Sequence, residues 1–103
     1  MIALAVPAAP ASAGAKACEP VRNPYPGTRY DGVDLSRIRA VRASCRTARR
    51  VARRAHRKAM LEPPSANGIR RFRWDGWRVR GDLRPAHDRY LARKGTRRVR
   101  WRF

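Results

Sequence analysis

The sequence predicts an α+β fold, in which one main α-helix packs on a small antiparallel β-sheet of hairpins after an N-terminal extended lead. Residues 45–59 place their apolar side chains on one side of a helical wheel. Residues 69–103 alternate apolar and basic residues with a period of two, and turn signals interrupt them. The 103 residues fit one small domain and exclude a multi-domain enzyme.

The first seventeen residues are typical of a shortened export signal. Met1–Val6 is apolar, and residues 7–17 contain three of the small-x-small patterns typical of signal peptidase sites. A basic start is missing and the apolar stretch is short, so we expect Met1 to be a misplaced start inside a longer signal peptide. Residues 1–17 would then be cleaved or disordered, and residues 18–103 would form the single domain. The alternative is a disordered tail on a cytosolic protein.

Export would explain the two cysteines. Cys18 and Cys45 are the only pair, and an even number of cysteines in a small exported domain favours a disulfide. This bond would close about 27 residues and stabilise the fold by roughly 3–3.5 kcal/mol through loop entropy. The alternative is two free thiols, with Cys45 acting as a small buried apolar group.

The segment between the cysteines begins as a lead without regular structure. Residues 19–34 contain three prolines and two glycines, which predicts a loop with turns. We expect Tyr25, Tyr30 and Val33 to lay this lead over the core. Residues 35–43 are ambiguous, because they fit either a short strand or the first turns of a long helix.

Ser44 is a good N-cap for the helix that follows, since its hydroxyl oxygen can accept from an early backbone amide. The predicted inner face of the helix consists of small or apolar residues: Cys45, Ala48, Val51, Ala52, Ala55 and Ala59. The opposite face is basic: Arg46, Arg49, Arg50, Arg53, Arg54, Arg57 and Lys58. We expect His56 to lie at the boundary between the two faces.

Two hairpins are predicted after the helix. Asp75-Gly76 lies between alternating strands and is a strong hairpin signal. In this register Trp74 opposes Trp77 and Phe72 opposes Val79 on one face, while Arg73 opposes Arg78 on the other. The second hairpin combines residues 90–93, a turn at Lys94-Gly95 and residues 98–103. Its alternation predicts three core residues, Val99, Trp101 and Phe103.

Short strings in the helix and strands carry a resemblance to a family: Ser44–Ala52, Gly76–Arg80, Arg93–Gly95 and Val99–Phe103. With them, residues 35–103 resemble small exported actinobacterial proteins of uncharacterised function. The resemblance implies a cysteine-bearing helix, short strands and a second cysteine pair, at positions that Val79 and Ala92 occupy here. It implies export and a fold but brings no catalytic residues.

The composition is strongly cationic. There are 26 Lys and Arg against 7 Asp and Glu, for a net charge of +19, and the excess lies after residue 36. Such a charge attracts polyanions and membrane surfaces. Aromatic residues interleave with arginines in the strands, which fits either base stacking and lipid insertion or a core that hides the aromatic side chains. The period of two favours the core.

Few residues could support catalysis. His56 and His87 are far apart in the sequence, and His87-Asp88 is the single pair that could orient an imidazole. No phosphate-binding glycine loop, paired carboxylates or zinc-finger spacing is evident. We therefore expect no enzyme, no cofactor and no metal site.

The sequence favours a secreted or envelope-associated monomer that binds anionic polymers or surfaces non-specifically. Its expected partners are envelope polymers, anionic lipid headgroups or nucleic acid. The expected contacts come from the helix and the last strand: Arg46, Arg50, Arg53, Arg54, Arg57, Arg98, Arg100 and Arg102. The alternatives are a cytosolic nucleic-acid-binding protein, a membrane-active defence protein and, least favoured, a small exported hydrolase that uses His87.

Overall fold

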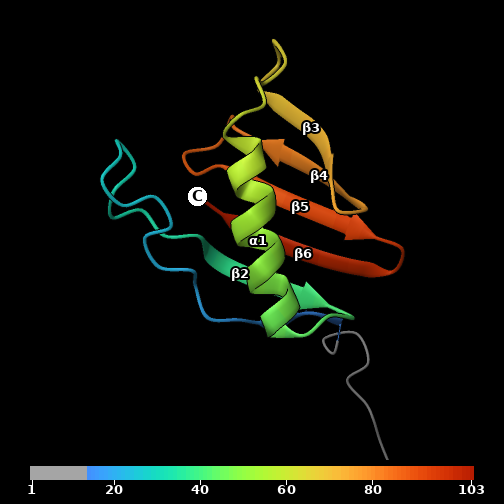
Figure 1. The fold of residues 1–103 in the computed structure, drawn as a ribbon. Helices are drawn as coiled ribbons and strands as arrows, with labels where there is room; N and C mark the ends of the chain where they lie inside the picture. Colours follow the sequence, from blue (N-terminus) through green and yellow to red (C-terminus); the bar gives the residue numbers. More distant parts are fainter. Residues whose placement is uncertain (1–13) are drawn as a thin grey trace, which may run out of the picture.

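A computed structural model describes residues 14–103 (Figure 1). One helix lies across one side of a six-stranded antiparallel sheet with the strand order β1-β2-β6-β5-β4-β3, so the predicted α+β fold is confirmed. The elements in chain order are β1 (Lys16–Ala17), β2 (Ser36–Val41), α1 (Cys45–Ala59), β3 (Ile69–Trp74), β4 (Trp77–Asp82), β5 (Arg89–Lys94) and β6 (Arg97–Arg102).

The first hairpin has the predicted register. Trp74 pairs with Trp77, and Phe72 pairs with Val79. Asp75 and Gly76 both have positive φ angles, of 47° and 79°, as a tight primed turn between twisted strands requires. In the second hairpin the turn falls at residues 95–96, one residue later than predicted, because Lys94 still pairs with Arg97.

The ambiguous residues 35–43 form a strand rather than the start of a helix. β2 pairs with β6, the last strand of the chain, and shifts register between Ser36 and Arg39. At this irregularity Arg37 has a positive φ of 54°. The pairing places the end of the chain inside the sheet, between β2 and β5.

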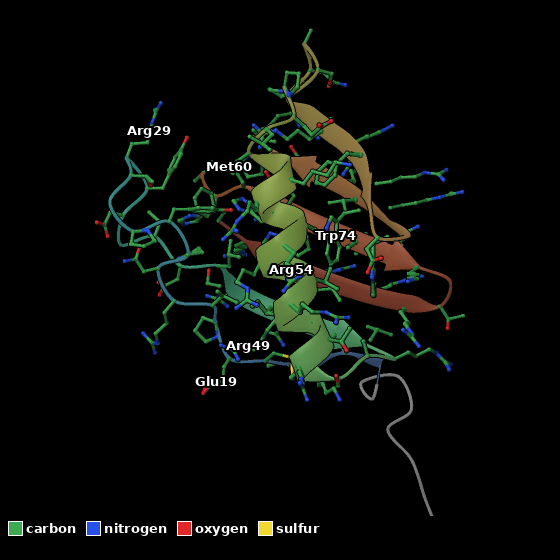
Figure 2. The ribbon with its side chains drawn as sticks, viewed as in Figure 1. Glu19, Arg29, Arg49, Arg54, Met60 and Trp74 are labelled. Atoms are coloured by element: carbon green, nitrogen blue, oxygen red, sulfur yellow. A yellow bond between two sulfur atoms is a disulfide. The ribbon has the colours of Figure 1, made fainter. Side chains whose placement is uncertain are left out.

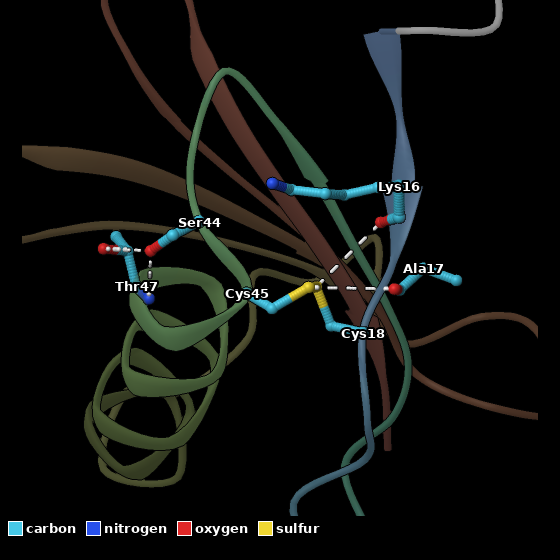
Figure 3. Close-up of a disulfide and its surroundings, with 6 residues drawn as sticks. All are labelled: Lys16, Ala17, Cys18, Ser44, Cys45 and Thr47. Atoms are coloured by element: carbon cyan, nitrogen blue, oxygen red, sulfur yellow. Dashed lines mark hydrogen bonds between the residues drawn. A yellow bond between two sulfur atoms is a disulfide. The ribbon is translucent and has the colours of Figure 1, made fainter.

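α1 begins where predicted and packs its small residues on the sheet. The Ser44 hydroxyl oxygen accepts a hydrogen bond of 3.0 Å from the Thr47 amide (Figure 3). The predicted inner face is buried, from Ala48 to Ala59, and only Cys45 is half-buried. Small side chains let the helix lie close to the large residues of the strands, among them Trp101 and Val99.

The predicted disulfide joins Cys18 to Cys45, with 5.4 Å between their Cα atoms (Figure 3). It ties the N-terminus of α1 to the segment that follows β1. Lys16 and Ala17 pair with Ala40 and Arg39 of β2, so the sheet includes the last two residues of the predicted export signal. Residues 1–13 of that signal lie outside the described residues.

The lead crosses the open end of the core. Val21 bridges Leu35, and the rings of Tyr25 and Tyr30 pack against Phe103 at centroid distances of 5.7 and 5.3 Å. The prediction that Val33 also covers the core is wrong, since its side chain is 38% exposed. Two of the three expected contacts therefore hold the lead in place.

The prediction that His56 is a boundary residue is also wrong, because its side chain is fully buried. The helical wheel places His56 at the edge of the inner face, but Tyr25 and Phe103 reach over it from the lead and the C-terminus. Helical periodicity contains no information on these non-local neighbours.

Candidate anion-binding face

The sheet has one side covered by α1 and one side lined by arginines. Because side chains alternate along a strand, every second residue of β2–β6 points away from the helix. We call these arginines the sheet arginine face. They are Arg37 and Arg39 in β2, Arg71 and Arg73 in β3, Arg78 and Arg80 in β4, Arg89 and Arg93 in β5, and Arg98, Arg100 and Arg102 in β6. All are exposed except Arg102, which is half-buried.

Strand pairing aligns these side chains into rows that run across the strands. The first row is uninterrupted and consists of Arg73, Arg78, Arg93 and Arg98, each a register partner of the next. The second row consists of Arg71, Arg80, Leu91, Arg100 and Arg39. Neighbours within a row are about 4.8 Å apart and successive rows about 6.8 Å apart.

Two shallow hollows lie on this face, one between the first and second rows and the other between the second row and Asp82, Arg89 and Arg102. One, of about 680 Å³, is lined by five arginines and no acidic residue: Arg71, Arg73, Arg78, Arg80 and Arg93. The other, of about 370 Å³, lies nearer β2 and includes Arg39, Arg100 and Asp82. Arg80 and Leu91 line both hollows, so the two adjoin and form one track from β3 to β2.

Almost no charge on this face is neutralised within the molecule. In residues 14–103 the one ion pair joins Arg84 to Asp82, with Nε and Oδ1 2.9 Å apart. The hydrogen bonds from Arg84 hold the pKa of Asp82 well below its usual range. Asp31 and Asp34 accept hydrogen bonds from the lead instead. The rows of guanidinium groups therefore face one another and the solvent.

A second cationic surface lies on α1. Its six arginines, which we call the helix arginine face, are exposed on the side of the helix that points away from the sheet: Arg46, Arg49, Arg50, Arg53, Arg54 and Arg57. Arg49 and Arg54 are labelled on it in Figure 2. Arg49 also donates a hydrogen bond to the Pro20 carbonyl oxygen, 3.3 Å away. Lys58, predicted for the same face, donates instead to the Arg73 carbonyl oxygen.

The structure divides the predicted binding residues between these two surfaces. Arg46, Arg50, Arg53, Arg54 and Arg57 lie on the helix arginine face, on one side of the sheet. The other three, Arg98, Arg100 and Arg102, belong to the sheet arginine face on the opposite side. One flat ligand surface cannot contact both groups together.

Most of the sheet arginine face was not among the predicted binding residues. Arg71, Arg80, Arg93 and Arg39 share it with the predicted strand residues. The alternation of arginine with apolar residues in the hairpins was the available signal. The pairing of β2 with β6, which brings Arg39 beside Arg100, has no local signal in the sequence.

The buried histidine belongs to a polar cluster under the lead. The Tyr25 hydroxyl and His56 Nδ1 share a hydrogen bond of 2.6 Å, and Arg70 donates to the Tyr90 hydroxyl over 2.9 Å. Burial, helped by the positive charge of Arg70, lowers the pKa of His56 to about 3. Burial also raises the pKa of Tyr25 to about 12. Both groups are neutral at pH 7, and His56 is sealed from any substrate.

Other reactive groups are not gathered into a site. His87 is exposed, beside the half-buried Asp88 in the loop before β5. The described part of the chain holds no cluster of three or more His, Cys, Asp or Glu side chains placed to bind a metal ion. In the same residues no helix has the length and apolar character needed to cross a membrane.

The fold and its arginine-lined side define the molecule as a small cationic α+β protein. Comparison with known proteins finds no match to the chain among family models, curated proteins or solved structures. The two arginine faces are therefore the features of this molecule that point to a function.

Proposed function

We propose that this protein is a secreted or envelope-associated cationic domain that binds anionic polymers or surfaces without catalysis. The observation that carries the proposal is the sheet arginine face, on which register partners such as Arg78 and Arg93 oppose each other without an acidic neighbour in the row. Like charges placed directly opposite each other destabilise a sheet. A polyanion on this face would remove that repulsion, and such binding needs no catalytic group.

The disulfide supports the proposed location. Cys18–Cys45 is the type of bond that persists in oxidising compartments and is rare in the cytosol. The proposal for location is tested by fractionating cells that produce the protein and measuring the mass and thiol content in each fraction. Oxidised protein outside the cytoplasm is the expected result, and a reduced cytosolic protein would contradict it.

Binding is tested by titrating the full oxidised chain with a fluorescent anionic oligomer at increasing salt. The logarithm of the association constant should fall linearly with the logarithm of salt concentration, because bound counterions are released from the polymer. For several phosphate contacts, affinity should drop by roughly a thousandfold between about 50 and 200 mM salt. An affinity that is independent of salt would refute the proposal.

A further inference from the structure

The two arginine faces differ in what they can bind, and this difference identifies one of them as the site. On α1 the arginines lie on a convex helix, and the hollow beside them, lined by four of the arginines, also contains the acidic residue Glu19. On the sheet they form rows of four on a surface of five strands, about 19 Å across. The adjoining hollows turn these rows into a continuous track.

The chemistry of the track favours phosphate. A guanidinium group presents a planar fork of donors that matches two oxygens of a phosphate group, and it stays charged at every physiological pH. Five arginines and no acid surround the larger hollow. The hollow is open and shallow, so a chain can pass through it, and its overlap with the second hollow at Arg80 and Leu91 allows the same chain to continue toward β2.

The face has no exposed aromatic residue to stack on bases and no continuous apolar stripe to enter a lipid layer. The rings of Trp77, Tyr90 and Trp101 are buried, and the half-buried Phe72 and Trp74 pack against the core. Phe72 lines the larger hollow, and Tyr90 and Trp101 line the smaller one. Base stacking, the usual source of affinity for single-stranded nucleic acid, needs an exposed ring, and none of these strand residues is exposed. Two half-buried apolar residues lie on this side, Leu91 in the second row and Val41 opposite Arg98, and two separate groups do not make the apolar stripe that inserts into a membrane.

A double helix also fits this face poorly. Nothing projects from the sheet into a groove, and the phosphates of a duplex curve away from a surface that it touches along one side. A flexible chain can follow a row of arginines at its spacing of about 4.8 Å. The number of phosphate groups in contact is therefore larger for a flexible chain than for a duplex.

From these observations we infer that the sheet arginine face is the binding site for a flexible, base-free phosphodiester polymer, which lies across the strands along the track. The inference rests on the proposed function and deepens it by naming the face and the ligand chemistry. The central contacts come from Arg73, Arg78 and Arg93 of the first row, which line the larger hollow, and Arg98 extends that row beyond it.

Two variants with the same loss of charge test which face binds. R78Q/R93Q/R98Q removes three arginines from the first row, and R50Q/R53Q/R57Q removes three from the helix arginine face. The probe is a fluorescent oligomer of about twelve deoxyribose phosphates without bases. We expect the sheet variant to raise its Kd at least about tenfold and to lower the salt slope by about two, and the helix variant to change the Kd less than about threefold.

Equal weakening in both variants would overturn the sheet site while leaving the proposed function intact, because it would show binding by net charge alone. No binding by the unmodified protein would refute the proposed function itself. Unfolding curves control for folding, and the sheet variant should be at least as stable as the parent because three like-charge contacts are relieved.

A second set of probes tests the ligand chemistry. The base-free oligomer is compared with oligothymidylate of equal length, with a duplex and with polyglutamate. We expect the two single chains to bind within about threefold of each other, because bases find no exposed aromatic ring, and the duplex and polyglutamate to bind more weakly. Tenfold tighter binding of oligothymidylate or duplex would overturn the base-free ligand in favour of nucleic acid.

Discussion

The two sides of the sheet are built from the same strands, but one side pairs buried apolar residues and the other pairs exposed arginines. On the helix side, Val79, Ala92 and Val99 are buried partners in the core. One residue along each strand, Arg78, Arg93 and Arg98 are exposed partners that repel one another. The helix side therefore supplies the stability that lets the other side keep a charge pattern that opposes folding. Because side chains alternate along a strand, the residues that stabilise the fold and the residues proposed to bind a polyanion lie on opposite sides of one sheet.

Adjacent residues of β6 give the largest expected contrast. Trp101 is 1% exposed and stacks on Tyr90 with 5.2 Å between ring centroids, whereas Arg100 points to the open side. Trp101→Ala should lower the free energy of unfolding by about 3–5 kcal/mol, because it leaves a cavity. Arg100→Ala should change it by less than about 0.5 kcal/mol. Denaturant titration measures both, and similar losses would contradict the two-sided description.

Removing the Cys18–Cys45 disulfide is expected to have the next largest effect on the free energy of unfolding. Cys18 and Cys45 are separated by 27 residues, and their bond anchors α1 on the helix side. Replacing both with serine should lower the free energy of unfolding by about 3.5 kcal/mol, because the unfolded chain regains loop entropy. Equilibrium unfolding of the variant and of the reduced parent protein measures this, and the two should agree. A loss below about 1 kcal/mol would show that the described tie contributes little.

Acid should weaken the helix side through His56. Its folded pKa of about 3 lies below the ordinary value of 6.5, so the unfolded chain binds a proton first as the pH falls. Stability should be complete above pH 6.5 and fall by about 1.4 kcal/mol for each pH unit below it, which is roughly 2.5 kcal/mol near pH 4.5. The pKa values of Asp31 and Asp82 are lowered from 3.8, so the stability that these two carboxylates contribute is lost mainly at a pH below the range in which His56 acts.

Unfolding measured between pH 7.5 and 4.5 tests the role of His56, with His56→Gln as the matched variant. Glutamine is polar but does not titrate, so the variant should lose stability at pH 7 and show a flatter pH profile. Burial raises the pKa of Asp88, which opposes the loss slightly at the acid end. An equally steep profile in the variant would assign the pH dependence to other groups.

Local patterns in the sequence were enough to predict the helix and the four strands of the two hairpins, but not β1 or β2. The Asp75-Gly76 turn and the alternation on either side determine the register of the first hairpin, and Ser44 marks the start of α1. These features depend on neighbours in the chain. The Cys18–Cys45 pair was also predictable, because there was no other partner for either cysteine.

What the sequence did not predict depends on contacts between distant segments. Nothing local indicates that β2 pairs with β6, so the position of Arg39 beside Arg100 was missed. His56 was misplaced for the same reason, since Tyr25 covers it from the lead. The positions where the resemblance implies cysteines, Val79 and Ala92, are register partners on the helix side. That pairing also becomes visible only when β4 and β5 are placed together.

A smaller effect, of the opposite sign, is expected from a charge reversal on the open side. Arg93 is flanked by its register partners Arg78 and Arg98, so Arg93→Glu replaces two repulsive contacts with two attractive ones. Cross-strand pairs of opposite charge contribute roughly 0.2–1 kcal/mol each, so the free energy of unfolding should rise by about 0.5–1 kcal/mol at low salt. The same change should weaken binding of a phosphodiester oligomer, because the first row is interrupted.

A stability gain together with a binding loss would separate this side of the sheet from the other, since a substitution in a core lowers both. Arg22→Glu is the control, because Arg22 is exposed in the lead, outside both arginine faces, and its replacement makes the same change in net charge. The control should leave stability within about 0.5 kcal/mol. Salt should abolish the gain in Arg93→Glu, because exposed charges are screened. If Arg93→Glu lowered the free energy of unfolding instead, repulsion between the opposed arginines would not destabilise the sheet. A bound polyanion would then have no repulsion to relieve.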